Sequence, residues 1–250
     1  MPNWCYNRMN VTGDRESLVK LTEAITRKHD SSLAETTMGV EQVDYDLSVL
    51  FPIPDELRIT AMFFSTETDD PEYQELLKKY EANKEKYGYT TWYDWAIENW
   101  GTKWSPRIEE WEIIDHSDGS GGIYAYYETA WSPADGLIRE VSKQFPTLLF
   151  TVSSDEEGRS FSCVMAFSKG EMVAEAGCEL DPNKVPEQFR EAYARIDKEI
   201  ESGVSESGVS ESGYDAWDEM SELDSDILGW LETEVDNQLR DKGLLPKLSV

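Results

Sequence analysis

The chain has 250 residues, of which 51 are Asp or Glu and 23 are Lys or Arg, so its formal net charge is -28 at pH 7. This length is sufficient for one large domain or two small ones with a hydrophobic core. Such a charge disfavours direct binding to DNA, RNA or anionic membranes, and it favours partners that carry basic surfaces.

The N-terminal segments predict a strand, a helix and a second strand. Residues 4–13 read as a strand that ends at Gly13, and Asp14 is placed to cap the following helix. The apolar stripe predicted for that helix is Leu18, Leu21 and Ile25. In "YDLSVLFPIP" apolar residues alternate from Tyr45 to Phe51, which predicts a strand that stops at Pro52.

Two helices are predicted next. Asp70 and Pro71 are typical of the cap and the first position of a helix, here a mostly polar one that extends to about residue 87. The segment "YDWAIENWGTKWSP" at 93–106 is rich in tryptophan. A helical stripe predicted to lie in the core consists of Tyr93, Ile97, Trp100 and Trp104. Gly101 is expected to end the regular helix, and only Trp92 and Trp95 fall off the stripe.

The middle of the chain predicts strands around one well-marked helix. Residues 107–131 read as two strands joined by a Gly-rich turn, or as one strand after a loop. "WSPADGLIREVSKQFP" predicts a helix with Ser132 as N-cap and Pro133 at the first helical position. Three further segments predict an antiparallel meander: "TLLFTVSS", "SFSCVMAFS" and "MVAEAG".

This order predicts an α+β fold. The expected architecture is a ferredoxin-like antiparallel sheet with helices on one face, a helical insertion at about 66–111, and an acidic helical C-terminal extension. The predicted domains are residues 1–177 for the ferredoxin-like part and 178–250 for the extension.

The C-terminal extension has the most unusual charge pattern. A helix is predicted over "PEQFREAYARIDKEI", and the repeated unit in "ESGVSESGVSESG", residues 201–213, is typical of a Gly/Ser linker. From Glu199 to Leu239 there are thirteen Asp or Glu and no Lys or Arg. Apolar residues recur at helical spacing in the same region, from Trp217 to Leu239, so a helix that packs against something is expected.

Several blocks of the sequence resemble the YubB-like family of phage and plasmid proteins. They are "MPNWCYNRMNVTGD", "LSVLFPIPDEL", "NWGTKWSP" and "YETAWSPADGLIREVSKQFPTLLFTVSSDEEG". The resemblance covers roughly residues 1–175, and it implies a ferredoxin-like fold and a mobile-element origin. It implies no catalytic residues and no activity, and the acidic extension lies outside it.

The leading functional hypothesis is a non-enzymatic accessory protein of a phage or mobile element, located in the host cytoplasm. It would inhibit a host nucleic-acid-binding or defence protein by presenting carboxylates along a helix, much as a duplex presents phosphates. The expected contact residues are Glu211, Asp215, Trp217, Asp218, Glu219, Glu222, Asp224, Asp226 and Trp230. No cofactor, nucleic acid or membrane is expected as a direct partner, and homo-oligomers remain open.

The alternative hypothesis is a small-molecule or nucleotide-binding module. Its pocket would lie against the sheet near Trp92, Trp95 and Trp131.

Catalysis and metal binding have weaker support in the sequence. A pair of Cys163 and His116 is conceivable for nucleophilic catalysis, but Cys163 lies in a strand pattern typical of a buried thiol. The segment "DHSDGSGG" lacks the ligand register of a calcium loop, so a hairpin turn and no metal site are expected there. Cys5, Cys163 and Cys178 are expected to be reduced, and with no apolar N-terminal segment they favour a cytoplasmic location.

Overall fold

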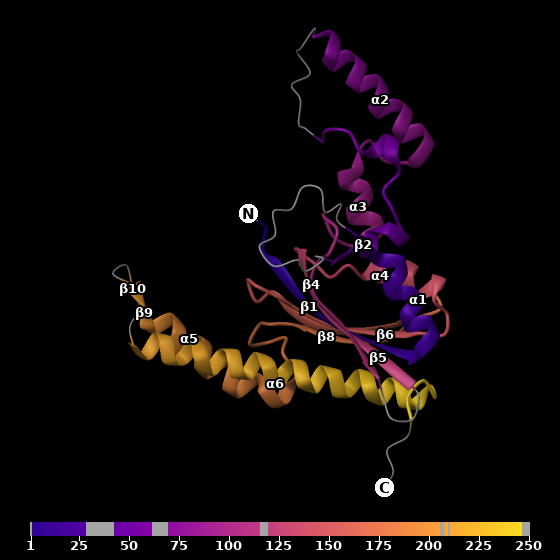
Figure 1. Cartoon of the computed structure of the whole chain (residues 1–250). Coiled ribbons are helices and arrows are strands. Elements are labelled where there is room, and N and C mark those ends of the chain that lie inside the picture. The colour runs from indigo at the N-terminus through magenta and orange to yellow at the C-terminus, as the bar shows by residue number, and fades with distance from the viewer. Residues whose placement is uncertain are drawn as a thin grey trace, which may run out of the picture.

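A computed structural model describes residues 2–28, 43–61, 70–115, 120–205, 208–209 and 211–246 (Figure 1). Its centre is a six-stranded antiparallel sheet with the strand order β4-β5-β1-β6-β7-β8. The strands of this sheet are β1 (Trp4–Asp14), β4 (Arg107–Asp115), β5 (Ser120–Ala130), β6 (Leu149–Glu156), β7 (Phe161–Ser168) and β8 (Glu171–Glu179). The α-helices are α1 (Arg15–Ile25), α2 (Pro71–Tyr87), α3 (Trp92–Trp100), α4 (Asp135–Gln144), α5 (Arg190–Gly203) and α6 (Glu211–Asp241).

The path of the chain through the first four strands is ferredoxin-like. The chain runs β1-α1-β4-β5-α4-β6, and β1 lies between β5 and β6 in the sheet, with Met9 opposite Ala125 on one side and Val152 on the other. This is the split β-α-β arrangement expected from the sequence. Strands β7 and β8 then extend the sheet beyond β6 as the predicted meander.

The first face of the sheet is covered by α1 and α4 (Figure 1). As predicted, the Asp14 carboxylate caps α1 by accepting a hydrogen bond from the Ser17 amide at 2.9 Å. The core on this side is aliphatic and aromatic. It includes Leu18, Leu21, Ile25, Trp95, Trp100, Leu137, Ile138, Val141 and Phe150.

The second face of the sheet is covered over β7 and β8 by α5 and α6, which lie opposite α1 and α4 (Figure 1). Helices α1 and α4 of the ferredoxin-like part thus share one face, as predicted, and the helical C-terminal extension, whose position the sequence left open, covers the other. The physical reason lies in β7, where Val164 and Ala166 point to α6 while Met165 and Phe167 point to the first core. A strand buried on both faces has a continuous apolar run, which "CVMAF" provides.

The prediction of a strand at residues 45–51 was wrong. Tyr45 ends a short strand, β3 (Val43–Tyr45), which pairs with β2 (Thr26–Lys28), and the following residues form the 3-10 helix η1 (Leu47–Leu50). Asp46 accounts for the turn, because its carboxylate accepts hydrogen bonds from both the amide and the hydroxyl of Ser48. A second 3-10 turn, η2 (Asp55–Leu57), follows Pro54.

Helix α4 begins later than its cap pattern predicts. Its N-cap residue is Ala134, with no side-chain capping bond, and Asp135 is its first residue. Ser132 instead donates its hydroxyl proton to the Gly101 carbonyl and so joins the end of α3 to the start of α4. The prediction of Ser132 as N-cap was wrong because this tertiary partner competes for the hydroxyl.

The Gly/Ser repeat at 201–213 connects α5 to α6. Within the part of the repeat that the structure describes, β9 (Val204–Ser205) pairs with β10 (Gly208–Val209), and Glu211 already belongs to α6. The 3-10 helix η3 (Glu187–Phe189) precedes α5. The two helices thus run as a hairpin along the sheet (Figure 1).

Candidate functional site

Helix α6 is docked on the sheet through an apolar stripe. Met220, Ile227, Leu231, Val235 and Leu239 are all buried against β7, β8 and α5. Polar contacts fix the helix at several points along its length. The Ser153 hydroxyl donates to the Glu232 carboxylate at 2.7 Å, and the Gln238 amide donates to the Glu175 carbonyl at 2.8 Å. The carboxylates of α6 are therefore carried on a fixed element.

Five exposed carboxylates lie on the side of α6 that points away from the sheet, and we call them the acidic face. They are Asp215, Asp218, Glu219, Glu222 and Asp226. At about 1.5 Å of rise per residue, successive members are about 1.5–6 Å apart along the helix. Glu219 pairs with Arg195 of α5, and hydrogen bonding from that guanidinium lowers the pKa of the Glu219 carboxyl. The other four have no ion pair with any residue that the structure describes.

Asp224, a predicted contact residue, does not belong to the acidic face. Its carboxylate accepts two hydrogen bonds from Arg159, at 2.7 and 3.1 Å, and both side chains are only 22% exposed. The guanidinium also contacts the rings of Tyr193 and Trp217, at 5.4 and 5.7 Å from their centroids. Asp224 is thus part of the contact that holds α6 to the turn after β6.

The two tryptophans among the predicted contact residues are both partly covered by neighbouring side chains. Trp217 is 41% exposed and lies on the side of α6 that faces Arg159. Trp230 is partly buried, with its ring centroid 6.4 Å from that of Phe189. The backbone of Glu211 starts α6, and its side chain lies outside the described part of the structure.

The tryptophan cluster around α3 is divided differently from the prediction. Trp95 and Trp100 are buried, whereas Tyr93, Ile97 and Trp104 are about 40% exposed. The phase of the helix is set by contacts with Phe51, the residue after η1: the Trp100 indole donates to the Phe51 carbonyl at 2.8 Å, and the Trp95 ring packs on the Phe51 ring. The predicted stripe was wrong for Tyr93 and Ile97 because the contacts with Phe51 turn Trp95 and Trp100 toward the core. It was wrong for Trp104 because Gly101, with φ +81°, ends the helix before it.

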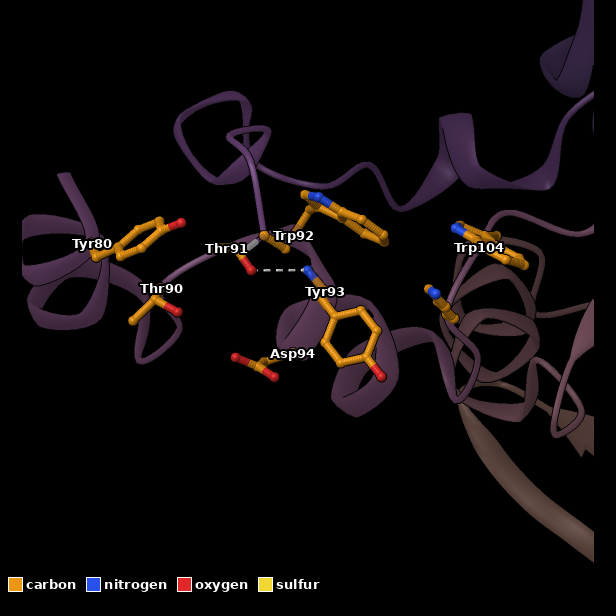
Figure 2. A pocket seen from close by; sticks show the side chains of 9 residues that line it. Tyr80, Thr90, Thr91, Trp92, Tyr93, Asp94 and Trp104 are labelled. Carbon is orange, nitrogen blue, oxygen red and sulfur yellow. Dashed lines mark hydrogen bonds between the residues drawn. The ribbon is translucent and has the colours of Figure 1, made fainter. Parts of the chain in front are cut away.

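An open hollow of about 580 Å³ lies beside the exposed part of this cluster, and we call it the aromatic hollow. Figure 2 shows Trp92, Tyr93 and Trp104 around it, with Thr91 capping α3 through the Tyr93 amide. Lys103 also lines it, with its ammonium 4.3 Å from the Trp104 ring centroid. Of the three tryptophans predicted for a pocket, only Trp92 lies there, because Trp95 is in the core and Trp131 follows the end of β5.

The titratable groups give little support to nucleophilic catalysis. Burial raises the pKa of the Cys163 thiol to about 12, so the thiol stays protonated at neutral pH. His116 and His29 lie outside the described residues, so the pair of Cys163 and His116 has no geometry here. Among the residues described, no three His, Cys, Asp or Glu side chains are grouped so that they could hold a metal ion.

Comparison with known proteins supports the fold. Residues 99–196 match a family model described as the ferredoxin-like domain in Api92-like protein. The match extends past Gly177 into α5, and it confirms the predicted ferredoxin-like domain. The family matched is the Api92-like one, so the resemblance to YubB-like phage and plasmid proteins stays a prediction.

A solved structure of protein Api92 from Yersinia pseudotuberculosis is also similar, with 12% identity and a TM-score of 0.40. That similarity covers 70% of this chain and 98% of the Api92 chain. No curated protein gave a match to the sequence. No helix in the described ranges is both long and apolar enough to cross a membrane.

Two basic residues that organise these sites were missed from the sequence. Arg159 sits in the turn "DEEGRS", where a lone base beside a dense acidic helix signals a possible ion pair across the fold. Lys103 lies between Trp100 and Trp104, and a cation flanked by aromatic rings is a known pattern. The partner of Arg159 could not be chosen without knowing that its turn lies beside α6.

Proposed function

We propose that this protein is a non-enzymatic binding protein that occupies the basic, nucleic-acid-binding surface of another protein. The observation that carries the proposal is the acidic face of a docked helix. Four carboxylates without ion pairs to described residues fall within residues 215–226. At about 1.5 Å of rise per residue, successive charges lie about 5.5 Å apart on average, a spacing wider by less than a factor of two than the roughly 3.4 Å along one DNA strand.

The docking of α6 makes such a surface effective. A helix that is already ordered loses little conformational entropy when it binds, so more of the interaction energy is available for affinity. The net charge of -28 adds long-range attraction to a basic partner, which increases the association rate. Nucleic acids themselves are repelled by the same charge.

A mobile-element origin, as the resemblance to YubB-like proteins implies, would make the partner a host protein. We propose that the partner is a nucleic-acid-binding or defence protein of a bacterial host and that binding takes place in the host cytoplasm. Inhibition would follow from occupancy, because the partner's Lys and Arg side chains cannot hold nucleic acid and the acidic face at the same time.

Capture from bacterial lysate tests this proposal. The bait is the full chain, compared with a variant that neutralises the four unpaired carboxylates: Asp215→Asn, Asp218→Asn, Glu222→Gln and Asp226→Asn. The matched control removes the same number of exposed charges elsewhere, through Glu23→Gln, Glu81→Gln, Glu85→Gln and Glu112→Gln. Duplex DNA is added as a competitor in a parallel experiment.

We expect nucleic-acid-binding proteins to be captured by the wild type and by the control variant, and released by the competing DNA. The variant with a neutralised acidic face is expected to lose them. Equal capture by both variants, or capture that DNA does not compete, would contradict the proposal. Truncation before Glu201 is a poor substitute, because it would uncover Val164, Ala166 and Ala174 in the second core.

A further inference from the structure

The loop after α3 brings aromatic and basic side chains together on a surface far from the acidic face in sequence. Trp92 and Tyr93 start α3, and Lys103 and Trp104 follow its end. The Trp92 and Tyr93 rings meet edge to face, with centroids 5.8 Å apart. Tyr93 and Trp104 are each 38% exposed, so parts of their rings are open to a ligand.

A second hollow of about 540 Å³ adjoins the aromatic hollow and shares Trp92, Lys103 and Trp104 with it. Arg27 and Arg58 line this second hollow. Both volumes fall in the range of about 300–1,000 Å³ that is usual for small-molecule sites. One ligand could therefore extend from the rings into the region of the two arginines.

The local charge is opposite to that of the protein as a whole. Three basic residues line the two hollows, against two carboxylates, Asp94 and Asp46. Asp46 is already engaged, by Arg27 at 2.6 Å and by the hydroxyls of Ser48 and Ser105. Among the described residues, the one carboxylate that Arg58 contacts is the fully exposed Asp55, at 3.5 Å.

Lys103 is the central residue of this arrangement. Its ammonium lies 4.3 Å from the Trp104 ring centroid and 5.4 Å from that of Tyr93, and it has no ion pair within the described ranges. A cation held by ring faces, without a carboxylate, is free to pair with an anion that arrives with the ligand. Lysine is a common phosphate-binding side chain for this reason.

We infer that the two hollows form one site for a nucleoside phosphate. The base would stack against the rings of Trp92, Tyr93 and Trp104, and the phosphate would face Lys103, Arg58 and Arg27. The site is separate from the acidic face, so it stands or falls independently of the proposed function. A single nucleotide suits the protein better than a long polyanion, which the net charge of -28 would repel.

Calorimetric titration of the full chain tests the inference. The probes are the four common nucleoside monophosphates, each compared with its nucleoside and with inorganic phosphate. At least one monophosphate is expected to bind saturably, while its nucleoside and phosphate alone bind at least tenfold more weakly. No saturable binding by any monophosphate up to millimolar concentration would overturn the inference.

Two variants locate the binding to the hollows, and one serves as control. Trp104→Leu and Lys103→Gln are each expected to weaken the monophosphate by about 5- to 100-fold, as loss of a stacked ring or a charged contact does. Trp131→Leu removes another exposed tryptophan, one that lines neither hollow, and this variant is expected to bind as the wild type. The assignment would be overturned if the first two variants bound the monophosphate as the wild type does, or if the control variant lost as much affinity as they do. Tight binding of a single-stranded decamer without binding of monophosphates would overturn it as well.

Discussion

The two helical layers that cover the faces of the sheet differ in the charges on their outer surfaces. The layer of α1 and α4 buries Leu18, Leu21 and Val141, and its exposed side mixes both charges. The layer of α5 and α6 buries an equally apolar stripe, yet the outside of α6 is almost purely acidic. Since the apolar stripe alone would hold α6 in place, the acidic face is a separate feature that packing does not explain.

The largest expected effect tests whether α6 is an integral layer. Ile227→Ala removes a fully buried side chain of α6, and Leu137→Ala is its counterpart in α4. Each is expected to destabilise the protein by about 2–4 kcal/mol through lost burial and a residual cavity. Thermal unfolding followed by circular dichroism should show one transition at lower temperature for both. A separate early transition in Ile227→Ala alone would mean that α6 unfolds independently of the sheet.

The next effect separates the buried and exposed tryptophans of the α3 region. Trp100→Phe removes a buried indole and leaves the Phe51 carbonyl without its donor, at an expected cost of about 1–3 kcal/mol. Trp104→Phe changes a partly exposed ring, and we expect a cost of about 0.5 kcal/mol or less. Urea denaturation measures both. Comparable costs would support the stripe predicted from the sequence over the observed phase.

The contact between Arg159 and Asp224 is expected to contribute less than the core. Arg159→Leu leaves a largely buried carboxylate unpaired, which should cost about 1–3 kcal/mol. Asp224→Asn and the double variant complete a double-mutant cycle measured by urea denaturation. A coupling energy near zero would show that this pair does not help to hold α6 on the sheet.

The smallest effect depends on pH and involves Asp155, a residue of β6 that lies near α6. Desolvation raises the pKa of its carboxyl, with Arg8 of β1 opposing the shift and Asp224 and Glu232 of α6 adding to it. Because the folded pKa is above the unfolded value, the stability from this group is present at low pH and lost as pH rises through the folded pKa.

The Asp155→Asn variant has no carboxyl to ionise at this position, so it does not lose this stability as pH rises. Relative to the wild type, the variant should gain stability between pH 4 and pH 7, by about 0.5 kcal/mol or less for so exposed a group. Melting temperatures at the two pH values measure the difference. If instead the stability of the wild type rose relative to that of the variant with increasing pH, the pairing with Arg8 would outweigh desolvation.

Much of the fold could be predicted because local signals agreed with the tertiary structure. Two helices begin at the predicted caps Asp14 and Asp70, whose carboxylates accept backbone hydrogen bonds, and α3 ends at Gly101, which adopts the left-handed conformation. The strands of the meander are separated by clear turns. The ferredoxin-like order follows from these elements. For Ser132 a tertiary contact replaced the predicted cap, whereas for Leu47 to Phe51 the local turn at Asp46 overrode the alternating apolar pattern.

The candidate sites were less predictable. In α3 six of the nine residues are apolar or aromatic, so the hydrophobic period could not determine which tryptophans face the core. For α6 the sequence indicated both the apolar stripe and the acid density. It could not show that Arg159 and Arg195 neutralise Asp224 and Glu219, since those pairs join distant parts of the chain.

The central claim is that the acidic face of α6 is the partner-binding surface. The most direct test is the salt dependence of affinity for a captured partner, compared between the wild type and the variant neutralised at Asp215, Asp218, Glu222 and Asp226. We expect wild-type affinity to fall steeply with salt, and neutralisation both to weaken binding and to flatten this slope. A neutralised variant with unchanged affinity and slope would contradict it and assign binding to another surface.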